Sequence, residues 1–166
     1  MAVIQKKICM LGSFGVGKTS LVARFVQGIF SAKYLSTVGV KIDKKNMRVN
    51  GKDVFLVVWD IYGEDDYQKM RWTYLRGASG YLLVADGTRK ATLQKAFDLE
   101  QRVCEEVGAI PFVLVINKYD LLQDWEIDSA LESEIAGKKW NVLRSSAKTG
   151  EGVEEAFSLL AQKMLG

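Results

Sequence analysis

A glycine-rich run near the N-terminus, residues 12–19, restricts the possible folds more than any other feature of the chain. It reads Gly-x-x-x-x-Gly-Lys-Thr and lies between an apolar stretch, residues 8–11, and a helical pattern. Accessible glycine amides and the N-terminus of a helix together form a cradle for anions. Lys18 can reach the terminal phosphates of a nucleotide, and the Thr19 hydroxyl can ligate Mg²⁺. The alternative is a simple glycine turn before a helix, but the position between strand and helix favours a phosphate-binding loop.

Short apolar runs alternate with longer helical patterns along the chain. The runs cover residues 8–11, 54–59, 81–85, 112–116 and 140–143. Such alternation is typical of a mostly parallel sheet that is covered by helices on both faces. The apolar residues between Val153 and Met164 have the spacing of an amphipathic helix, so we expect a helix at this end of the chain.

One pair of strands departs from this alternation. Two strand-like runs within residues 38–59 flank Asn50 and Gly51, the strongest short signal for a β-hairpin, so one strand is expected to be antiparallel. With 166 residues, of which 48% are hydrophobic, the chain has the size of one domain. The sequence predicts a single α/β domain over residues 1–166 with a P-loop NTPase fold, in which about five helices flank a six-stranded, mostly parallel sheet.

Basic residues gather on the predicted hairpin. They are Lys41, Lys44, Lys45, Arg48 and Lys52. Basic residues at such a place commonly protect an edge strand from pairing with other chains. The alternative is a surface that binds an acidic partner. The net charge of the whole chain is only +3, which argues against a nucleic-acid partner.

Histidine is absent from the chain, which excludes His-dependent triads, histidine metal sites and histidine general bases. Cys9 and Cys104 lie far apart in apolar patterns, so we expect two buried, reduced thiols, as in cytoplasmic proteins. The N-terminus has no secretory signal, and no apolar run approaches the roughly 18 residues that span a bilayer. The C-terminus carries no cysteine for lipidation, so no stable membrane anchor is expected.

A second motif, residues 117–120 with the sequence Asn-Lys-Tyr-Asp, directly follows the apolar run at 112–116. The carboxyl ends of parallel strands lie at one edge of a sheet, so this motif is expected near the phosphate loop. The Asp120 carboxylate can accept two hydrogen bonds from the ring N–H and the exocyclic amine of guanine. Adenine would offer the same carboxylate a lone pair and leave its charge unpaired, so the motif favours guanine.

A third motif, residues 145–148, follows the last apolar run and reads Ser-Ser-Ala-Lys. It can supply a backbone amide to the carbonyl oxygen of the base. Each tetrapeptide alone is weak evidence, and a solvated loop would explain it as well. Because both follow successive strands downstream of a phosphate loop, together they indicate a guanine-nucleotide site.

In their order and spacing these motifs resemble the Ras superfamily of small GTPases, and within it the Rab-like branch. The resemblance covers the whole chain. The residues that carry it are GSFGVGKT from residue 12; Phe30, Tyr34 and Thr37; WDIYG from residue 59; YLRGASGYLLVADGT from residue 74; NKYD from residue 117; and SAK from residue 146.

The resemblance implies a protein that binds GTP or GDP with Mg²⁺ and hydrolyses GTP. Thr19 and Thr37 would ligate the metal, with Asp60 in its second coordination sphere. Asn117 would link the base loop to the phosphate loop, and Lys118 would lie along the face of the base. The other positions implied in nucleotide binding are Gly12, Ser13, Phe14, Gly15, Val16, Gly17, Lys18, Ser20, Phe30, Tyr34, Gly63, Asp120, Leu121, Ser146, Ala147 and Lys148.

The same resemblance implies a conformational switch. The γ phosphate would be held by Thr37 and by the amide of Gly63, so its loss would relax the segments around them and release partners. Effector, exchange-factor and GTPase-activating proteins would accordingly bind a monomer through residues 30–45 and 61–76. The residues implied in catalysis are Lys18, Thr37, Gly63 and Glu64.

Three residues beside the expected γ phosphate depart from the family. Phe14 replaces a residue that is usually small, because a catalytic water, a glutamine and sometimes a partner's arginine meet there. Glu64 replaces that glutamine, and Tyr62 replaces the usual alanine. A carboxylate only accepts hydrogen bonds, and its charge beside a triphosphate raises the energy of the reactive arrangement. We therefore expect intact nucleotide binding and slow hydrolysis.

Other interpretations stay open. Residues 64–66 can form the acidic first turn of a helix that reaches Leu75, although this does not explain the missing glutamine. Glu64 can also act as a general base, which would permit rapid turnover. The alternative function is an interaction module of the same fold that stays in one nucleotide state. An ATP-using P-loop kinase is disfavoured by Asp120.

Overall fold

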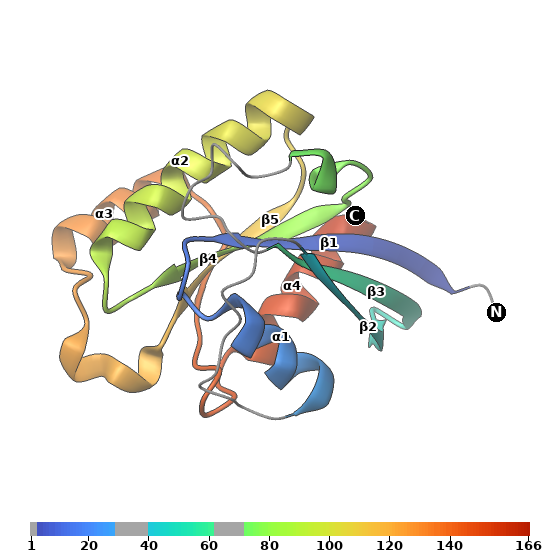
Figure 1. The fold of residues 1–166 in the computed structure, drawn as a ribbon, viewed down its shortest axis with the longest axis horizontal. Coiled ribbons are helices and arrows are strands. Elements are labelled where there is room, and N and C mark those ends of the chain that lie inside the picture. Colours follow the sequence, from blue (N-terminus) through green and yellow to red (C-terminus); the bar gives the residue numbers. More distant parts are fainter. Residues whose placement is uncertain (1–2, 29–39, 62–71) are drawn as a thin grey trace.

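The computed structural model describes residues 3–28, 40–61 and 72–166, and its centre is a six-stranded sheet (Figure 1). The strands are β1 (Ile4–Gly12), β2 (Val40–Val49), β3 (Lys52–Ile61), β4 (Gly80–Asp86), β5 (Phe112–Asn117) and β6 (Val142–Arg144). They are arranged in the order β2-β3-β1-β4-β5-β6. β2 pairs antiparallel with β3, and the other pairs are parallel, which confirms the predicted sheet.

Helices cover both faces of this sheet. The described residues contain α1 (Lys18–Gln27), α2 (Lys90–Val107), α3 (Ser129–Lys138) and α4 (Val153–Leu165), with two short 3-10 helices, η2 (Trp72–Leu75) and η3 (Tyr119–Asp124). α1 and α4 pack on one face, where Phe25 stacks on Phe157 with ring centroids 3.8 Å apart. α2 and α3 pack on the other face. Among the helices of the described ranges, none is both long enough and apolar enough to cross a membrane.

Burial on both faces explains why the central strands read as unbroken apolar runs. All seven residues of β4 are buried. Leu82 and Val84 contact the core under α1 and α4, whereas Tyr81, Leu83 and Ala85 contact the core under α2. Since successive side chains of a strand point to opposite faces, a strand between two helical layers needs apolar residues at every position.

The hairpin between β2 and β3 forms at the predicted turn. Val49 pairs with Lys52, and the two residues between them have positive φ angles, 51° for Asn50 and 75° for Gly51. Positive φ at both positions is the requirement of a type I′ turn, which Asn-Gly satisfies with little strain. β2 lies at the edge of the sheet, where its lysines fit the role of protecting an unpaired strand.

The structure differs from the sequence-based expectations in the last strand. β6 begins at Val142 rather than at residue 140, because the chain reverses after α3 through Lys139, which has a φ of 58°. Trp140 instead directs its ring at Phe97 and Phe112. The helix expected from residue 64 to residue 75 falls mainly outside the described residues, and its described end is η2.

The two cysteines differ in exposure, which corrects the expectation that both are buried. Both are free thiols; Cys9 is buried in β1, and burial raises the pKa of its thiol to about 12. Cys104 is exposed on α2. That helix buries Leu99 and Val103, and Cys104 follows about 100° further around the helix axis, outside the buried stripe.

We expect thiol reagents to distinguish the two cysteines. Native protein treated with iodoacetamide at pH 8 should take up one equivalent, on Cys104, because Cys9 is buried and carries a raised pKa. Protein unfolded in urea should take up two equivalents. Peptide mass spectrometry measures both, and rapid modification of Cys9 in the native protein would contradict the packing of β1.

Candidate functional site

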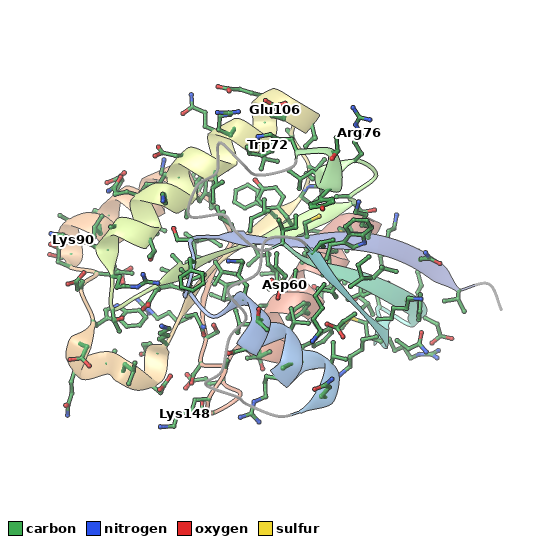
Figure 2. All side chains as sticks on the ribbon, in the orientation of Figure 1. Asp60, Trp72, Arg76, Lys90, Glu106 and Lys148 are labelled. Carbon is green, nitrogen blue, oxygen red and sulfur yellow. The ribbon has the colours of Figure 1, made fainter. Side chains whose placement is uncertain are left out.

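Polar residues meet at the edge of the sheet where the parallel strands end. β1, β3, β4, β5 and β6 run in the same direction, so their carboxyl ends lie together. Three loops begin there, at residues 12–18, 117–120 and 145–148. Asp60 and Asp86 lie at the same ends of β3 and β4, and Figure 2 shows Asp60 beside α1. The structure thus brings together the motifs that the sequence separates by up to about 130 positions.

Glycines allow the phosphate loop to lie close to the sheet. A Cβ atom on Gly12 would be 2.3 Å from the carbonyl oxygen of Val84, and one on Gly17 would be 2.3 Å from Asn117 Nδ2. Gly17 also has a φ of 104° at the N-cap of α1, which other residues rarely adopt. The first turn of α1 contains no acidic residue, so the positive end of the helix dipole can attract an anion.

The ammonium group of Lys18 holds the phosphate loop together by hydrogen bonding to its backbone. The residue is 6% exposed, and Nζ donates hydrogen bonds to the carbonyl oxygens of Gly12 and Ser13 at 3.0 and 3.1 Å. The hydroxyl of Ser13 is buried without a hydrogen-bond partner among the described residues. A buried positive charge and an unsatisfied hydroxyl in one loop are features that a bound phosphate would complement.

Asp60 and Thr19 form the described part of the predicted metal site. Thr19 Oγ1 donates to Asp60 Oδ2 at 2.6 Å, and Asp60 is 1% exposed. Its other oxygen, Oδ1, is buried and has no hydrogen-bond partner within the described ranges. Burial raises the pKa of Asp60, and the Thr19 hydrogen bond and the Lys18 charge offset this effect only in part. A cation nearby would compensate the buried carboxylate.

The donor atoms at this place fit Mg²⁺. Carboxylate and hydroxyl oxygens are hard ligands, and Mg²⁺ in nucleotide sites takes few protein ligands and keeps waters and phosphate oxygens. The described part of the chain contains no cluster of three or more Asp, Glu or Cys side chains that could hold a metal ion. Thr19 would be a ligand and Asp60 would support it, whereas Thr37 lies outside the described residues.

Asn117 joins the base loop to the phosphate loop, as the resemblance implies. The side chain is 2% exposed, and Nδ2 donates to the carbonyl oxygen of Val16 at 2.9 Å. Its Oδ1 accepts from Ser145 Oγ at 3.0 Å. Both ends of the amide therefore form buried hydrogen bonds, which tie together the loops that follow β1, β5 and β6.

Asp120 presents its carboxylate on the exposed side of the base loop. Ser146 Oγ donates to Asp120 Oδ1 at 2.7 Å and accepts from the Thr149 N–H at 3.1 Å. This chain of hydrogen bonds orients the carboxylate, while the residue as a whole remains exposed. An oriented, accessible carboxylate can accept hydrogen bonds from two adjacent donors of a ligand, which is the requirement that guanine sets.

Lys118 contacts a carboxylate that was not among the predicted site residues. Its φ is 70°, and its Nζ lies 3.0 Å from Asp86 Oδ2. Asp86 is 1% exposed and accepts further hydrogen bonds from the Thr88 N–H, Thr88 Oγ1 and Arg89 Nε at 2.9, 2.7 and 3.0 Å. Burial tends to raise the pKa of Asp86, but these hydrogen bonds outweigh it and lower the pKa. Asp86 is thus an ionised anchor for several donors.

Two arginines hold the loops through backbone carbonyl oxygens. Arg24 Nε donates to Ala147 O at 2.8 Å, and the same guanidinium donates to Lys148 O. Arg89 Nη2 donates to Phe14 O at 3.0 Å. No sequence pattern reveals such contacts, since the acceptors are backbone atoms more than 70 positions away. Asp86, by contrast, ends an apolar strand as Asn117 does, and that signal could have identified it.

Several predicted site residues lie outside the described residues. They are Phe30, Tyr34, Thr37, Tyr62, Gly63 and Glu64. Apart from Leu121, the predicted positions within the described ranges fall on the three loops, on the start of α1 or at strand ends. Leu121 follows the base loop on η3, and its side chain is 41% exposed.

Comparisons with known proteins agree with this arrangement. The family model described as "Ras family" matches residues 7–166. The Ras-related protein RabJ of Dictyostelium discoideum is 33% identical over an alignment that covers 98% of this chain and 64% of RabJ. The Ras-related protein Rab-13 of Rattus norvegicus is 30% identical, with 96% of this chain and 79% of Rab-13 covered. The GTP-binding protein yptV2 of Volvox carteri is 32% identical, with 96% and 75% covered.

We expect the Asn117 side chain to stabilise the protein even without a ligand. The Asn117→Ala variant leaves the Val16 carbonyl and the Ser145 hydroxyl without their buried partners, so the free energy of unfolding should fall by about 1 to 3 kcal/mol. Urea denaturation of nucleotide-free protein measures the change.

Asn141→Ala is the matched control, because Asn141 is exposed and its Oδ1 accepts from Lys163 Nζ at the surface. It should change the stability by about 0.5 kcal/mol or less. Equal effects of the two substitutions would contradict a special role for the link between the loops.

Proposed function

The chain belongs to the Ras family, and from this premise we propose that it is a Rab-like molecular switch that binds GTP or GDP with Mg²⁺. The observation that carries the proposal is the Asp120 carboxylate, which Ser146 holds at 2.7 Å on a loop that Asn117 ties to the phosphate loop. One end of the site is thus equipped for guanine and the other for phosphates, at a fixed separation.

Guanine selectivity follows from the chemistry of Asp120. A carboxylate accepts hydrogen bonds and donates none at neutral pH. Guanine offers two adjacent donors on one edge, whereas adenine offers a lone pair where the ring N–H of guanine would be. Binding of adenine would therefore place a lone pair against the Asp120 charge, and this repulsion disfavours ATP and ADP.

Phosphate binding depends on the loop that Lys18 closes. The N-terminal amides of α1 and the Lys18 ammonium group supply positive potential to the β and γ phosphates. Thr19 would ligate Mg²⁺, and its hydroxyl donates a hydrogen bond to Asp60. The metal would neutralise part of the phosphate charge. Thr37 and Gly63 are the residues that we propose to sense the γ phosphate.

Hydrolysis is the step that we expect to be slow. Phe14 belongs to the phosphate loop, and Arg89 holds its carbonyl oxygen, so the backbone that carries this large ring has a fixed place. A ring at that position would occupy the space of an arginine finger, whose contribution to the rate is about 10³ to 10⁵. Glu64 would add a negative charge where the family has a neutral amide, and Tyr62 would add bulk nearby.

A second candidate is an interaction module that stays in one nucleotide state. Phe14, Tyr62 and Glu64 favour it, because all three changes concern the γ phosphate, whereas the residues proposed for base and metal binding keep the family's identity. The binding roles of Lys18 and Asp60 are common to both candidates. The rate of GTP cleavage therefore decides between the two candidates.

Partners are proposed to bind the protein as a monomer through residues 30–45 and 61–76. The described part of these segments includes the edge strand β2, on which Ile42 is 45% exposed. Lys44 lies two positions further on the same face of the strand with an exposed side chain, whereas Lys41 on the other face pairs with Asp43 at 3.7 Å. An exposed apolar side chain beside a basic one on an edge strand suits an effector surface that combines apolar and acidic groups.

We expect the purified protein to prefer GDP over ADP by about a hundredfold or more, as measured by isothermal titration calorimetry with Mg²⁺ present. Asp120→Ala should remove most of this preference, because it weakens GDP binding and also removes the repulsion that disfavours ADP. Ser146→Ala should cause a smaller loss, because it removes only the hydrogen bond that orients the carboxylate. Equal affinity of the unaltered protein for the two nucleotides would disprove the proposal.

Single-turnover cleavage of GTP tests the expectation of slow hydrolysis. The double change Phe14→Ser with Glu64→Gln should speed cleavage by about tenfold or more, because it restores space and a neutral amide beside the γ phosphate. The affinity of the double variant for GDP should stay the same, which separates the reaction from binding. Unaided cleavage by the unaltered protein at the rate of an ordinary small GTPase, or no acceleration in the double variant, would refute this account.

A further inference from the structure

We propose that Arg89 is a positioning residue that clamps the phosphate loop to the end of β4 and thereby slows nucleotide release. The proposal rests on the proposed function and adds a residue that none of the motifs contains. It depends on three contacts of one guanidinium group, with a carboxylate, with a backbone carbonyl and with the backbone of a glycine.

Arg89 bridges two elements that are distant in sequence. It is the N-cap residue of α2, and its Nε donates to Asp86 Oδ2 at 3.0 Å. Its Nη2 donates to the carbonyl oxygen of Phe14 at 3.0 Å. A Cβ atom on Gly15 would be 3.3 Å from the same Nη2, so the guanidinium group lies directly against the backbone of the phosphate loop.

Through Asp86, Arg89 is also connected to the base loop. The carboxylate is 1% exposed and accepts from Lys118 Nζ at 3.0 Å, and Lys118 precedes Asp120 by two positions. Two hydrogen bonds from Thr88, one from the N–H and one from Oγ1, fix the other carboxylate oxygen, Oδ1. A displacement of the phosphate loop at Phe14 would therefore strain contacts that reach the base loop.

The link through Arg89 differs from the link through Asn117. Asn117 holds Val16, near the start of α1, whereas Arg89 holds Phe14 in the first half of the loop. The two contacts restrain different parts of one loop, and in this proposal the loop moves when a nucleotide leaves. Hydrogen bonds from a charged donor are stronger than neutral ones, so losing the contact with Arg89 should ease opening.

Charge supports the same conclusion. Arg89 and Lys118 carry two positive charges against the single negative charge of Asp86, so the cluster has a net charge of about +1 beside the phosphate loop. Such a charge attracts an anionic ligand in addition to fixing the loop. Removal of Arg89 makes this small cluster neutral.

Release of a fluorescent GDP analogue, followed after addition of excess GDP, measures the effect. Arg89→Met keeps an unbranched, flexible side chain without charge or donors, and it should release the nucleotide about tenfold faster. Arg89→Lys should also be faster than the unaltered protein, because one ammonium group cannot reproduce the fork that reaches both Asp86 and Phe14. Release from Arg89→Lys at the original rate would overturn the fork geometry.

Arg48→Met is the matched control. Arg48 forms a similar fork, with Nη1 to Asp53 Oδ1 at 3.2 Å and Nη2 to the Gly51 carbonyl oxygen at 3.2 Å, but it does so on the β2–β3 hairpin. It should release the nucleotide at the original rate. Equal acceleration by Arg48→Met and Arg89→Met would overturn the proposal, because loss of any exposed arginine would then have the same effect.

Amide hydrogen exchange of nucleotide-free protein supplies a second measurement. In Arg89→Met the amides of residues 13–17 should exchange faster, while those of the β2–β3 hairpin should not change. Uniformly faster exchange with a lower melting temperature would indicate general destabilisation and overturn the positioning role. Tight GDP binding with unchanged release in Arg89→Met would overturn this inference alone, whereas failure of the unaltered protein to bind GDP would also overturn the proposed function.

Discussion

β1, β4 and β5 lie between two layers of helices, and most of the structure depends on this burial. Because the strands pair in parallel, their carboxyl ends lie at one edge of the sheet. The loops that follow β1, β5 and β6 therefore lie close together. Loops that meet in a partly buried place must satisfy their polar groups internally. Asn117 and Arg24 do so by hydrogen bonding to backbone carbonyl oxygens of neighbouring loops, and Lys18 by hydrogen bonding to those of its own loop. The contacts that stabilise this edge are therefore the same contacts that shape the ligand site.

Two buried aspartates at this edge of the sheet differ in how completely the protein satisfies their carboxylates. Asp86 receives hydrogen bonds from Thr88, Lys118 and Arg89, and its lowered pKa reflects a carboxylate that protein donors satisfy. Asp60 is equally buried but keeps one oxygen without a hydrogen-bond partner among the described residues, and its pKa is raised. A carboxylate that the protein leaves incompletely satisfied is suited to a cation that arrives with a ligand. Asp86 thus stabilises the folded structure, whereas Asp60 is suited to support the proposed metal.

In the proposed function, nucleotide binding and GTP cleavage depend on different residues. Binding needs the loop geometry, the Lys18 charge and the Asp120 carboxylate, and the described structure provides a physical basis for each. Cleavage needs an accurately placed water beside the γ phosphate, where Phe14, Tyr62 and Glu64 differ from the family. If cleavage is slow as proposed and Arg89 also slows release, each nucleotide state would persist for a long time. Such persistence would suit a binding platform as well as a slow switch.

The sequence by itself determined the architecture and the location of the site. The Asn-Gly turn, the unbroken apolar runs and the Gly-Lys-Thr motif have strong local requirements, so the antiparallel hairpin, the buried strands and the phosphate loop could be predicted from neighbouring residues alone. Local patterns were wrong where packing decides: Trp140 is apolar yet lies outside β6, and Cys104 lies in an apolar pattern yet is exposed on α2.

Only the tertiary structure decided which side chains restrain the loops. Arg24 and Arg89 donate hydrogen bonds to backbone carbonyl oxygens. Every residue type has such an oxygen, so the amino-acid sequence does not indicate which residue is the acceptor. The path of the folded chain alone places Phe14 beside Arg89 and leaves one Asp60 oxygen without a hydrogen-bond partner among the residues that the structure describes. A sequence specifies what each residue can donate or accept, whereas the packing of distant segments determines which partner it meets.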